Sequence, residues 1–314
     1  MKAFVLNETG DINKLVLQEI EKPIIADREV LVKVRAISIN PVDVKARGNE
    51  GILTWLYKDQ RPVILGWDIS GDVVEVGNNA RNYKEGDAVF GMVNFPSAGN
   101  AYAEYIAIPE NQLALKPLNI SYEEAAAATL AALTAWQALV NAIKIKKGDR
   151  ILIHAASGGV GHFAVQIAKH FGAYVIGTSS ATNRDFILSL GADEHIDYRQ
   201  QDFEKQVNNL DAVVIPLPGD IIPKSLKILK PGGIAVNLLS GEADAYLDLA
   251  KELEVQLTSI LVHTSGDDMQ SLADLLSEGA IKAHIHKIFN FNLLPQAHQE
   301  VETGRTVGKV VINI

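Results

Sequence analysis

Cysteine is absent from the 314-residue sequence. Disulfide bonds, thiolate nucleophiles, iron–sulfur clusters and cysteine-based zinc sites are therefore excluded together. Aromatic residues make up only 6% of the chain, but hydrophobic residues reach 47% and charged residues 21%, a composition typical of a globular protein rather than a disordered chain. A chain of this length buries about three quarters of its surface on folding, so its core needs no disulfide or metal.

Positive charge and long apolar runs are also scarce. The chain has 29 Lys and Arg against 38 Asp and Glu, a formal net charge of −9, so we expect no general nucleic-acid or anionic-membrane surface. No uncharged apolar stretch approaches the roughly 18 residues of a transmembrane helix. The first residues, MKAFVLNETGDINK, lack the apolar segment of a secretory signal. These features predict a cytoplasmic protein whose partner is a small molecule.

The first third of the chain shows the pattern of β-strands. From Val30 to Ala36, apolar residues at every second position alternate with Leu31, Lys33 and Arg35, the mark of a half-buried strand. Short apolar runs separated by glycine, asparagine and proline continue the pattern: Gly71–Val76, Ala88–Met92 and Tyr102–Ile108. This spacing predicts a small, mostly β domain over residues 1–121, built as a barrel or a strongly bent sheet.

From residue 122 the pattern changes to α/β. Ser121 and Glu124 form a capping-box pair, and the Ala-rich run that follows predicts a helix to about Asn141. Strands and helices then alternate: strands Arg150–His154, Ala173–Thr178, Asp211–Ile215, Gly233–Leu238 and Gln256–Val262, helices Val160–Phe171 and Ile222–Leu229. Such alternation predicts a doubly wound parallel sheet over residues 122–262. Residues 263–314, with a helix at Asp268–Glu278 and strands at Ile285–Phe291 and Lys309–Ile314, are expected to complete the first domain.

The segment Ile151–Gly161, ILIHAASGGVG, predicts a dinucleotide site. It combines a strand, a tight glycine turn and a helix, with Ala156 in place of the first glycine of the dinucleotide fingerprint. Gly158 allows the backbone to approach a diphosphate, and Gly161 allows the helix to pack on the strand. The helix start offers free N–H groups to the anion, so we expect cofactor contacts at Ser157, Gly158, Gly159 and Val160. His154, at a strand end, is expected to be a hydrogen-bonded core residue.

The residues at the end of the next predicted strand indicate whether the cofactor is NADH or NADPH. An NAD site usually ends this strand with an acid that binds the ribose 2′-hydroxyl, whereas this chain has Thr178, Ser179 and Ser180 there, followed by Arg184. Hydroxyls and a guanidinium suit a 2′-phosphate, so the sequence favours NADPH. Tyr198 adds a further hydroxyl. The alternative for Arg184 is an exposed ion pair with Asp185.

Seven motifs in order resemble the zinc-free quinone oxidoreductase and enone oxidoreductase branch of the medium-chain dehydrogenase/reductase superfamily. They are Ile39–Lys45 (INPVDVK), Pro62–Gly77 (PVILGWDISGDVVEVG), Gly86–Gly91 (GDAVFG), Thr134–Leu139 (TAWQAL), His154–Gly161 (HAASGGVG), Leu190–Tyr198 (LGADEHIDY) and Gly308–Ile312 (GKVVI). The resemblance covers essentially the whole chain. It implies a GroES-like domain that encloses a Rossmann domain.

Departures from the zinc-dependent alcohol dehydrogenases bear on the chemistry. Where those enzymes have zinc ligands, Cys and His, this chain has Asn40 and Trp67, and it lacks their four-cysteine structural lobe. His284 and His286 have no evident third ligand, so we expect no metal. Without a metal, hydride must pass to a carbon that is already electrophilic, as in a quinone or an α,β-unsaturated carbonyl compound.

The resemblance implies that Lys45 reaches the cofactor and donates to the substrate oxygen. On spacing alone, Lys45 is also compatible with an exposed lysine or an Asp43–Lys45 pair. Asn40 is expected to order its loop or to contact the cofactor. Trp55, Tyr57 and Trp67 are candidates for the wall of a flat substrate pocket, or for core residues. Further cofactor contacts are expected at Thr134, Leu217, Leu239, Ser240, Val262, Gly308 and Lys309.

Three functions remain open on the sequence. The leading hypothesis is an NADPH-dependent reductase of quinones or activated alkenes. The others are an enoyl-thioester reductase of the same superfamily and a non-catalytic NADPH-binding sensor or structural protein. The segment Glu254–Val262 is predicted to be the last strand of the parallel sheet and to pair across a two-fold axis in a homodimer, unless the returning C-terminal segment covers it.

Overall fold

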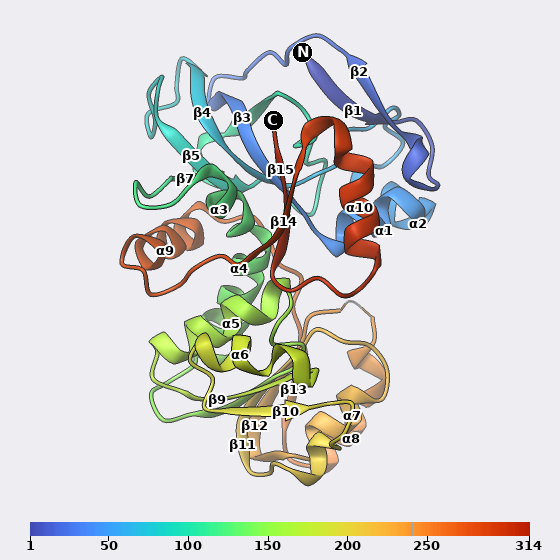
Figure 1. Ribbon diagram of the computed structural model, residues 1–314, viewed down its shortest axis with the longest axis vertical. Coiled ribbons are helices and arrows are strands. Elements are labelled where there is room, and N and C mark those ends of the chain that lie inside the picture. Colours follow the sequence, from blue (N-terminus) through green and yellow to red (C-terminus); the bar gives the residue numbers. More distant parts are fainter. Residues whose placement is uncertain (240) are drawn as a thin grey trace. The chain divides into compact units, whose positions relative to one another are not determined.

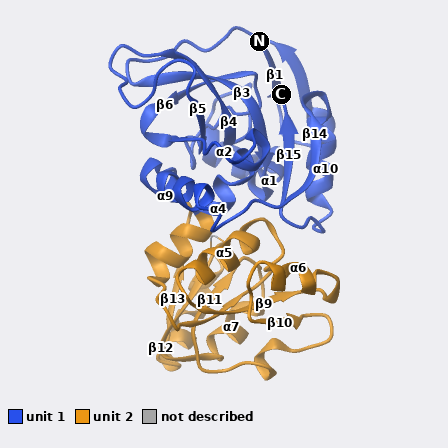
Figure 2. Cartoon of the chain, turned by 60° about the vertical axis from the view of Figure 1, so that its left-hand side comes forward, with its two compact units in different colours: residues 1–133, 263–314 blue, residues 134–262 orange. Residues whose placement is uncertain are grey.

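The computed structural model describes residues 1–239 and 241–314, which form two compact units. The first unit joins Met1–Leu133 to His263–Ile314, and the second is Thr134–Val262 (Figure 2). The first unit therefore extends beyond the predicted boundary at residue 121. The reason is the helix after Ser121, whose Ala126 and Ala127 are buried against strand residues of the first unit.

The first unit is β-rich. Its strands are β1 (Lys2–Leu6), β2 (Leu15–Glu19), β3 (Glu29–Ile39), β4 (Asp68–Val76), β5 (Ala88–Met92), β6 (Tyr105–Pro109), β7 (Ala114–Leu115), β14 (Ile285–Asn290) and β15 (Lys309–Asn313). Its helices are α1 (Pro41–Gly48), α2 (Glu50–Tyr57), α3 (Tyr122–Ala127), α9 (Gly266–Ser277) and α10 (Leu294–Glu302), and α4 (Leu130–Trp136) runs on into the second unit. Short 3₁₀ turns lie at Ile12–Lys14, Glu110–Gln112 and Phe291–Leu293.

The main sheet of this unit joins strands from both ends of the chain. Its order is β14-β15-β3-β4-β5-β7, and β6 also pairs with β3. Strand β15 is antiparallel to β3, so that Val311 lies opposite Ser38 (Figure 1). Strand β3 pairs with β15, β4 and β6, and most of its residues are buried. The predicted half-buried strand extends to Ile39.

The second unit has the doubly wound architecture expected from the sequence. Its strands are β8 (Arg150–Ile153), β9 (Tyr174–Ser179), β10 (Glu194–Asp197), β11 (Leu210–Ile215), β12 (Leu229–Asn237) and β13 (Gln256–Ser259). Its helical segments are the π-helix Gln137–Ile143, α5 (Gly159–His170), α6 (Arg184–Ser189), α7 (Ile221–Leu226), α8 (Leu247–Glu252), and 3₁₀ turns at Ala181–Asn183, Phe203–Lys205 and Ala243–Tyr246.

Strand order determines where a ligand can bind in this unit. All six strands are parallel, in the order β10-β9-β8-β11-β12-β13. Helices α5 and α6 lie on one side of the sheet and α7 and α8 on the other (Figure 1). The order reverses between β8 and β11, and ligands of such sheets bind beyond the carboxyl ends of the strands at this reversal. The glycine turn follows β8 directly.

The predicted Ala-rich helix is interrupted. The capping box of Ser121 and Glu124 is present, with the Ser121 Oγ accepting from the Glu124 N–H at 3.2 Å. However, α3 ends at Ala127, and α4 starts at Leu130, whose N–H donates to the buried Asp68 carboxylate at 3.0 Å. A side chain distant in sequence thus supplies the hydrogen-bond acceptor for the start of α4. Helix propensity, which depends on neighbouring residues alone, does not predict such a start.

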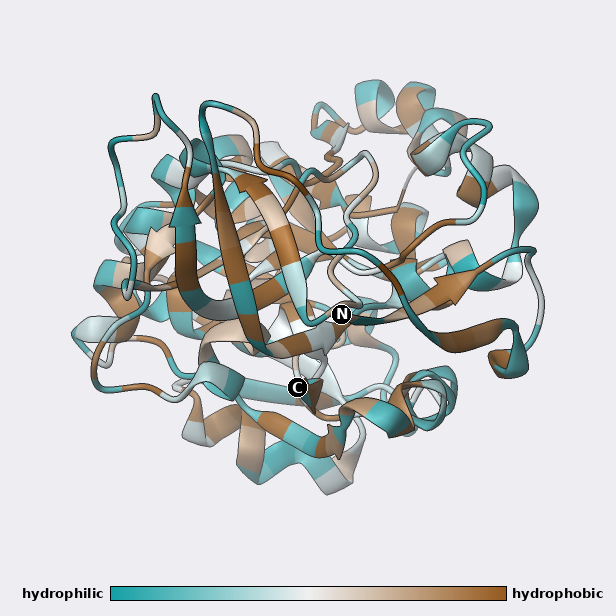
Figure 3. Cartoon of the chain, turned by 90° about the horizontal axis from the view of Figure 1, so that it is seen from above, coloured by the Kyte–Doolittle hydropathy of each residue, from teal (hydrophilic) through white to brown (hydrophobic). Residues whose placement is uncertain are grey.

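Hydropathy follows the strands. Figure 3 shows brown, hydrophobic residues concentrated along strands and teal residues in the connecting loops. In the second unit, Leu152, Ile176, Val213 and Ala235 from four adjacent strands belong to one buried cluster. Among the described residues, no helix has the length and apolar character needed to cross a membrane.

Candidate functional site

The turn after β8 is built by close backbone packing. Ala155 has a left-handed backbone with φ of 48°, and the N–H of Ala156 donates to the carbonyl of Thr178 at 2.9 Å. A Cβ at Gly161 would lie 2.2 Å from the Ala155 oxygen, so only glycine fits there. The turn is therefore fixed against both the neighbouring strand and the following helix.

This turn fits a dinucleotide diphosphate. Gly158 is the N-cap of α5, and the N–H groups of Gly159, Val160 and Gly161 occupy the first helical turn, where they have no acceptor within a helix. A Cβ at Gly158 would meet one atom within 4 Å, the Ala155 oxygen at 3.2 Å, so the other side of Gly158 is open to a ligand. Free N–H groups and the positive end of a helix are what a phosphate requires.

Two side chains hold the turn from beneath. His154 is buried, with Nδ1 at 3.2 Å from the Thr178 hydroxyl and Nε2 at 3.0 Å from the Ser225 hydroxyl. Burial lowers the pKa of His154 to about 3, so the ring is neutral. Thr178 also accepts from the Ala155 N–H at 3.3 Å. His154 is thus the hydrogen-bonded core residue expected from the sequence, and Thr178, predicted as a cofactor contact, is 3% exposed and supports the turn.

The end of β9 gathers polar side chains without a carboxylate. The Ser179 hydroxyl donates to the Ser180 carbonyl at 2.9 Å and lies 2.9 Å from Nε2 of His195 on β10. The Asn183 amide donates to the Ser157 hydroxyl at 3.0 Å, which joins this edge to the glycine turn. Neither His195 nor Asn183 was predicted from the sequence as a site residue. His195 could have been found from its position in the short strand β10, three residues before the predicted cofactor contact Tyr198.

Arg184 and Tyr198 flank the same edge. The N–H of Tyr198 donates to the Ser179 carbonyl at 3.2 Å, and the Tyr198 side chain is 58% exposed. Arg184 begins α6, is 60% exposed and pairs with Asp185 at 3.1 Å. The exposed ion pair considered for Arg184 is therefore formed. A pair this exposed contributes little, so it leaves the guanidinium available to a ligand.

Other predicted cofactor contacts in this unit follow strand ends. Leu217 comes two residues after β11 and Leu239 two residues after β12, and both are partly exposed. Thr134 and Val262, the first and last residues of the unit, are each 7% exposed. Ser240 lies outside the described residues. Leu217 and Leu239 thus share the carboxyl edge of the sheet with the glycine turn, and all four described contacts stay predictions.

The first unit holds a buried charged network around Lys309. The ammonium donates to the Ile39 carbonyl at 3.0 Å and to the Asn40 side-chain oxygen, and it lies 3.7 Å from the Asp68 carboxylate. Asn40 in turn donates to Asp68 at 2.7 Å. Burial lowers the pKa of Lys309, although the charges of Asp68 and Asp43 oppose this shift.

The network bears on two predicted site residues. Asn40 is buried and is the N-cap of α1, so it orders its loop as expected. The ammonium of Lys309 donates to the Ile39 carbonyl and the Asn40 side chain, both in the first unit. A direct contact with the cofactor would have to replace one of these two acceptors. That contact stays a prediction. The same holds for Gly308, where φ is 70° and a Cβ would lie 2.1 Å from the His284 oxygen.

Asp43 adds a second buried carboxylate to this network. One of its oxygens accepts from the Asn40 N–H at 2.6 Å, and the other has no hydrogen-bond partner in the described part of the chain. Burial raises the pKa of Asp43 to about 7, and the negative charge of Asp68 adds to the shift. Asp43 is therefore poised between its neutral and charged forms near pH 7.

Lys45 lies on the same helix as Asp43 but is exposed. Asp43 is fully buried, and the structure shows no Asp43–Lys45 ion pair among the described residues. The pair considered from the sequence is therefore not formed. An exposed ammonium without such a partner can donate to a substrate oxygen, which agrees with the predicted role without testing it.

The three aromatic candidates, for which pocket wall and core were both open, differ in burial. Trp67 is fully buried and donates from its indole nitrogen to the Ser97 carbonyl at 2.7 Å, and Tyr57 is 3% exposed and donates to the Ile64 carbonyl at 2.8 Å. Their rings lie 6.0 Å apart as core partners. Trp55 is 53% exposed. Only Trp55 of the three keeps a surface that a substrate can contact, because the other two fill the core of the unit.

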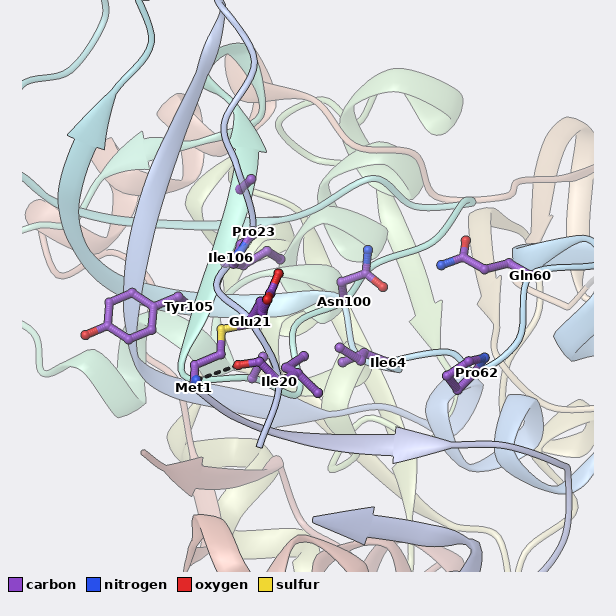
Figure 4. Close-up of a pocket in the computed structure, with 12 residues that line it drawn as sticks. Met1, Ile20, Glu21, Pro23, Gln60, Pro62, Ile64, Asn100, Tyr105 and Ile106 are labelled. Atoms are coloured by element: carbon purple, nitrogen blue, oxygen red, sulfur yellow. Dashed lines mark hydrogen bonds between the residues drawn. The ribbon is translucent and has the colours of Figure 1, made fainter. Parts of the chain in front are cut away.

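A cavity of about 260 Å³ in the first unit lies elsewhere (Figure 4). It is lined mainly by apolar side chains such as Ile20, Pro62 and Ile64, and the α-amino group of Met1 donates to the Ile20 carbonyl at 2.7 Å. None of the predicted site residues lines it. It therefore adds nothing to the candidate site.

The comparisons with known proteins identify the family. Residues 26–118 match the alcohol dehydrogenase GroES-like domain, and residues 190–312 match the model described as zinc-binding dehydrogenase. The chain is 34% identical to 2-methylene-furan-3-one reductase of Solanum lycopersicum, over 100% of this chain and 79% of that protein. It is 32% identical to the chloroplastic NADPH-dependent alkenal/one oxidoreductase of Arabidopsis thaliana, over 99% and 79%.

A solved structure agrees. The quinone oxidoreductase of Coxiella burnetii superposes with a TM-score of 0.94 at 35% identity, covering 100% of this chain and 99% of that chain. The protein belongs to the medium-chain dehydrogenase/reductase superfamily. Within that superfamily its relatives include quinone and enone oxidoreductases, as the sequence motifs indicated.

The two positions compared with zinc ligands are occupied differently in this medium-chain reductase. Asn40 is hydrogen-bonded to Asp68 and Lys309, and Trp67 is a core residue. Within the described ranges, no group of three or more His, Asp or Glu side chains is placed to hold a metal ion. The positive charge beside Asn40 and Asp68 in this chain is the ammonium of Lys309.

Proposed function

We propose that the protein is an NADPH-dependent reductase that transfers hydride to quinones or α,β-unsaturated carbonyl compounds. The observation that carries the proposal is the edge after β9. Ser179, Ser180 and Arg184 stand there where an NAD site has a carboxylate, so no carboxylate at the end of β9 repels a 2′-phosphate. The relatives named as alkenal/one and furanone reductases supply the substrate class.

The chain's own residues divide the work of binding. The N–H groups at the start of α5 hold the diphosphate beside Gly158. Arg184 and Tyr198 hold the 2′-phosphate, with Ser179 and Ser180 as supporting hydroxyls. Bound NADPH supplies a hydride from nicotinamide C4. These contacts fix the cofactor's adenosine end and diphosphate, which limits the orientations open to the nicotinamide.

Lys45 acts on the substrate oxygen in this proposal. When hydride reaches the conjugated carbon, negative charge develops on the oxygen at the far end of the conjugated system. An N–H donor placed there stabilises the charge, and the exposed ammonium of Lys45 is such a donor. Lys45 also donates to the nicotinamide ribose, which couples cofactor position to substrate position.

Turnover by the purified protein tests the function. NADPH oxidation is followed against a panel of quinones, enones and enoyl-CoA thioesters. Reduction of quinones or enones at rates well above those of the thioesters supports the proposal. Preferred reduction of the thioesters, or cofactor binding without turnover on any member of the panel, contradicts it.

The assembly proposed is a homodimer through the edge strand β13. Within the described part of the second unit, β13 pairs only with β12, and Leu261 just beyond it is 49% exposed. An apolar strand edge is protected when it pairs with its own copy across a two-fold axis. Light scattering at micromolar concentration is expected to give about twice 34.0 kDa. A mass of one chain, unchanged with concentration, contradicts the dimer.

We place the protein in the cytoplasm, where a reductase has access to reduced nicotinamide cofactor. The proposal rests on the sequence expectation alone. Fractionation of the source cells followed by immunodetection tests it, and recovery in a membrane or secreted fraction contradicts it.

A further inference from the structure

His195 is a titratable side chain whose hydrogen bond fixes the state of its ring. The Ser179 hydroxyl has a single proton, which it donates to the Ser180 carbonyl at 2.9 Å. With the Ser179 proton directed to the Ser180 carbonyl, Nε2 of His195 is the donor in its contact of 2.9 Å with Ser179 Oγ. In the neutral ring the proton is on Nε2, and Nδ1 is the nitrogen that takes up a second proton.

The strand register places this ring at the adenosine end of the cofactor site. His195 lies opposite Gly177 on β9, and its ring reaches the side chain of Ser179, the last residue of that strand. Ser180 and Arg184 follow within five residues, and the Asn183 amide links the segment to Ser157 in the glycine turn. The ring therefore belongs to the edge that receives the 2′-substituent of the ribose.

The charges around His195 come from three segments. Burial lowers the pKa of His195, and the charge of Arg184, at the start of α6, lowers it further. Asp197, on β10 with His195, raises it, as do the backbone carbonyls of Ser179, the last residue of β9, and of Ser180, which follows it. Asp185 is paired with Arg184, and Arg199 lies over the ring of Tyr198. Without a ligand, the site thus presents the guanidinium of Arg184 and the imidazole of His195. Among the groups named here, the two carboxylates beside them are Asp185 and Asp197.

We propose that His195 is a specificity-determining residue that takes up a proton when the 2′-phosphate binds, so that the preference for NADPH over NADH grows as the pH falls toward neutrality. This inference rests on the proposed use of NADPH. A phosphate dianion beside the ring stabilises the imidazolium and offsets its repulsion by Arg184. NADH has a hydroxyl at this position and brings no such charge.

The direction of the effect follows from linkage. The phosphate favours the protonated ring, so NADPH binding is strengthened at pH values below the pKa of His195 in the complex. The phosphate has its own ionisation near pH 6, which weakens binding below that pH. The window in which His195 dominates is therefore about pH 6.5 to 8.5. Across it we expect the ratio of the NADH Kd to the NADPH Kd to be about 3- to 10-fold larger at the acidic end.

Two substitutions isolate the histidine. His195→Gln keeps an amide donor for the Ser179 hydroxyl but removes the proton-binding nitrogen. His170→Gln changes an exposed histidine of α5 in the same unit and serves as the matched control. Affinities for NADPH and NADH are measured by fluorescence titration from pH 6.5 to 8.5, and proton uptake is measured by calorimetry at pH 7 in buffers of different ionisation enthalpy.

The proposal expects uptake of a fraction of a proton with NADPH and less with NADH. It also expects a pH-dependent preference in the wild type and His170→Gln that is lost in His195→Gln. If His195→Gln retains the wild-type pH dependence and proton uptake, the role of His195 is refuted while the NADPH preference stands. If the wild type shows no NADPH preference at any pH, the cofactor proposal fails and this inference fails with it.

The NMR titration of the His195 ring, assigned through His195→Gln, gives a readout independent of affinity. The titration midpoint of the ring is expected to rise with NADPH and not with NADH. An equal midpoint with both cofactors contradicts the proposal.

Discussion

Lys45 and Asp43 are two residues apart on one helix and have opposite environments. Asp43 is fully buried in the Asn40–Asp68–Lys309 network, whereas Lys45 is exposed. A helix places residues two apart on different faces, and in α1 the face that carries Asp43 is buried. The substrate-directed role is therefore assigned to the exposed cation, and the buried carboxylate supports the loop.

Lys45→Ala is expected to lower kcat/KM for accepted quinones or enones by about 10²- to 10³-fold, because a charged donor to the developing oxyanion is lost. Steady-state kinetics with saturating NADPH measure the effect. Lys84→Ala removes another exposed lysine of the same unit and serves as the control. Full activity of Lys45→Ala on every accepted substrate would show that the oxygen is stabilised elsewhere.

Arg184→Ala is expected to weaken NADPH binding by about 10- to 100-fold, since a charge-assisted hydrogen bond contributes about 1.5–3 kcal/mol. NADH, which lacks the 2′-phosphate, is expected to bind nearly unchanged. Lys205→Ala, which removes an exposed cation paired with Asp202 at 2.7 Å in the same unit, is the control. Equal losses for the two cofactors would mean that Arg184 supports the fold rather than the phosphate.

Among the helices and turns, short sequence motifs predicted those structures that depend on contacts within a few residues. The glycine turn was predictable because Gly158 and Gly161 are required by backbone packing within a few residues. The break between α3 and α4 was not, since its cause is Asp68, which lies 62 residues before Leu130. The position of Lys309 beside Asn40, across 269 residues, also depends on the pairing of β15 with β3. For Trp67 the sequence left both core and pocket open, because an aromatic residue in a loop has no periodicity that distinguishes the two.

Asp68→Ala is expected to destabilise the protein by about 3–5 kcal/mol, because the ammonium of Lys309 loses its buried carboxylate. The N–H of Leu130 at the start of α4 loses its acceptor as well. Denaturant unfolding measures the change. Asp72→Ala, on the same strand, removes a carboxylate that is not fully buried and whose partners are the 44% exposed Arg35 and the Tyr122 hydroxyl, and a much smaller loss is expected. Equal losses in the two variants would contradict the importance assigned to the network.

For the whole molecule, the buried carboxylate of Asp43 makes stability depend on pH. Its pKa of about 7 lies above the unfolded value of 3.8, so the folded state favours the protonated form. The stability that this group contributes is therefore present at acidic pH and is lost as the pH rises through about 7.

Asp43→Asn removes this dependence, because the amide stays neutral while its oxygen can still accept from the Asn40 N–H. The Tm of the variant relative to wild type is expected to be at least about 2 °C higher at pH 8 than at pH 5. Differential scanning fluorimetry at both pH values measures it, with the exposed Asp59→Asn as control. A Tm difference that does not change with pH would show that Asp43 is ionised throughout.

The central claim is that the protein moves hydride from NADPH to a conjugated carbon. The most direct measurement uses NADPH deuterated at C4 and an α,β-unsaturated ketone, with mass spectrometry and NMR of the product. The account predicts a saturated ketone with deuterium at the carbon β to the carbonyl, delivered from one face of the nicotinamide. Deuterium on a carbinol carbon, or a product without label, would contradict it.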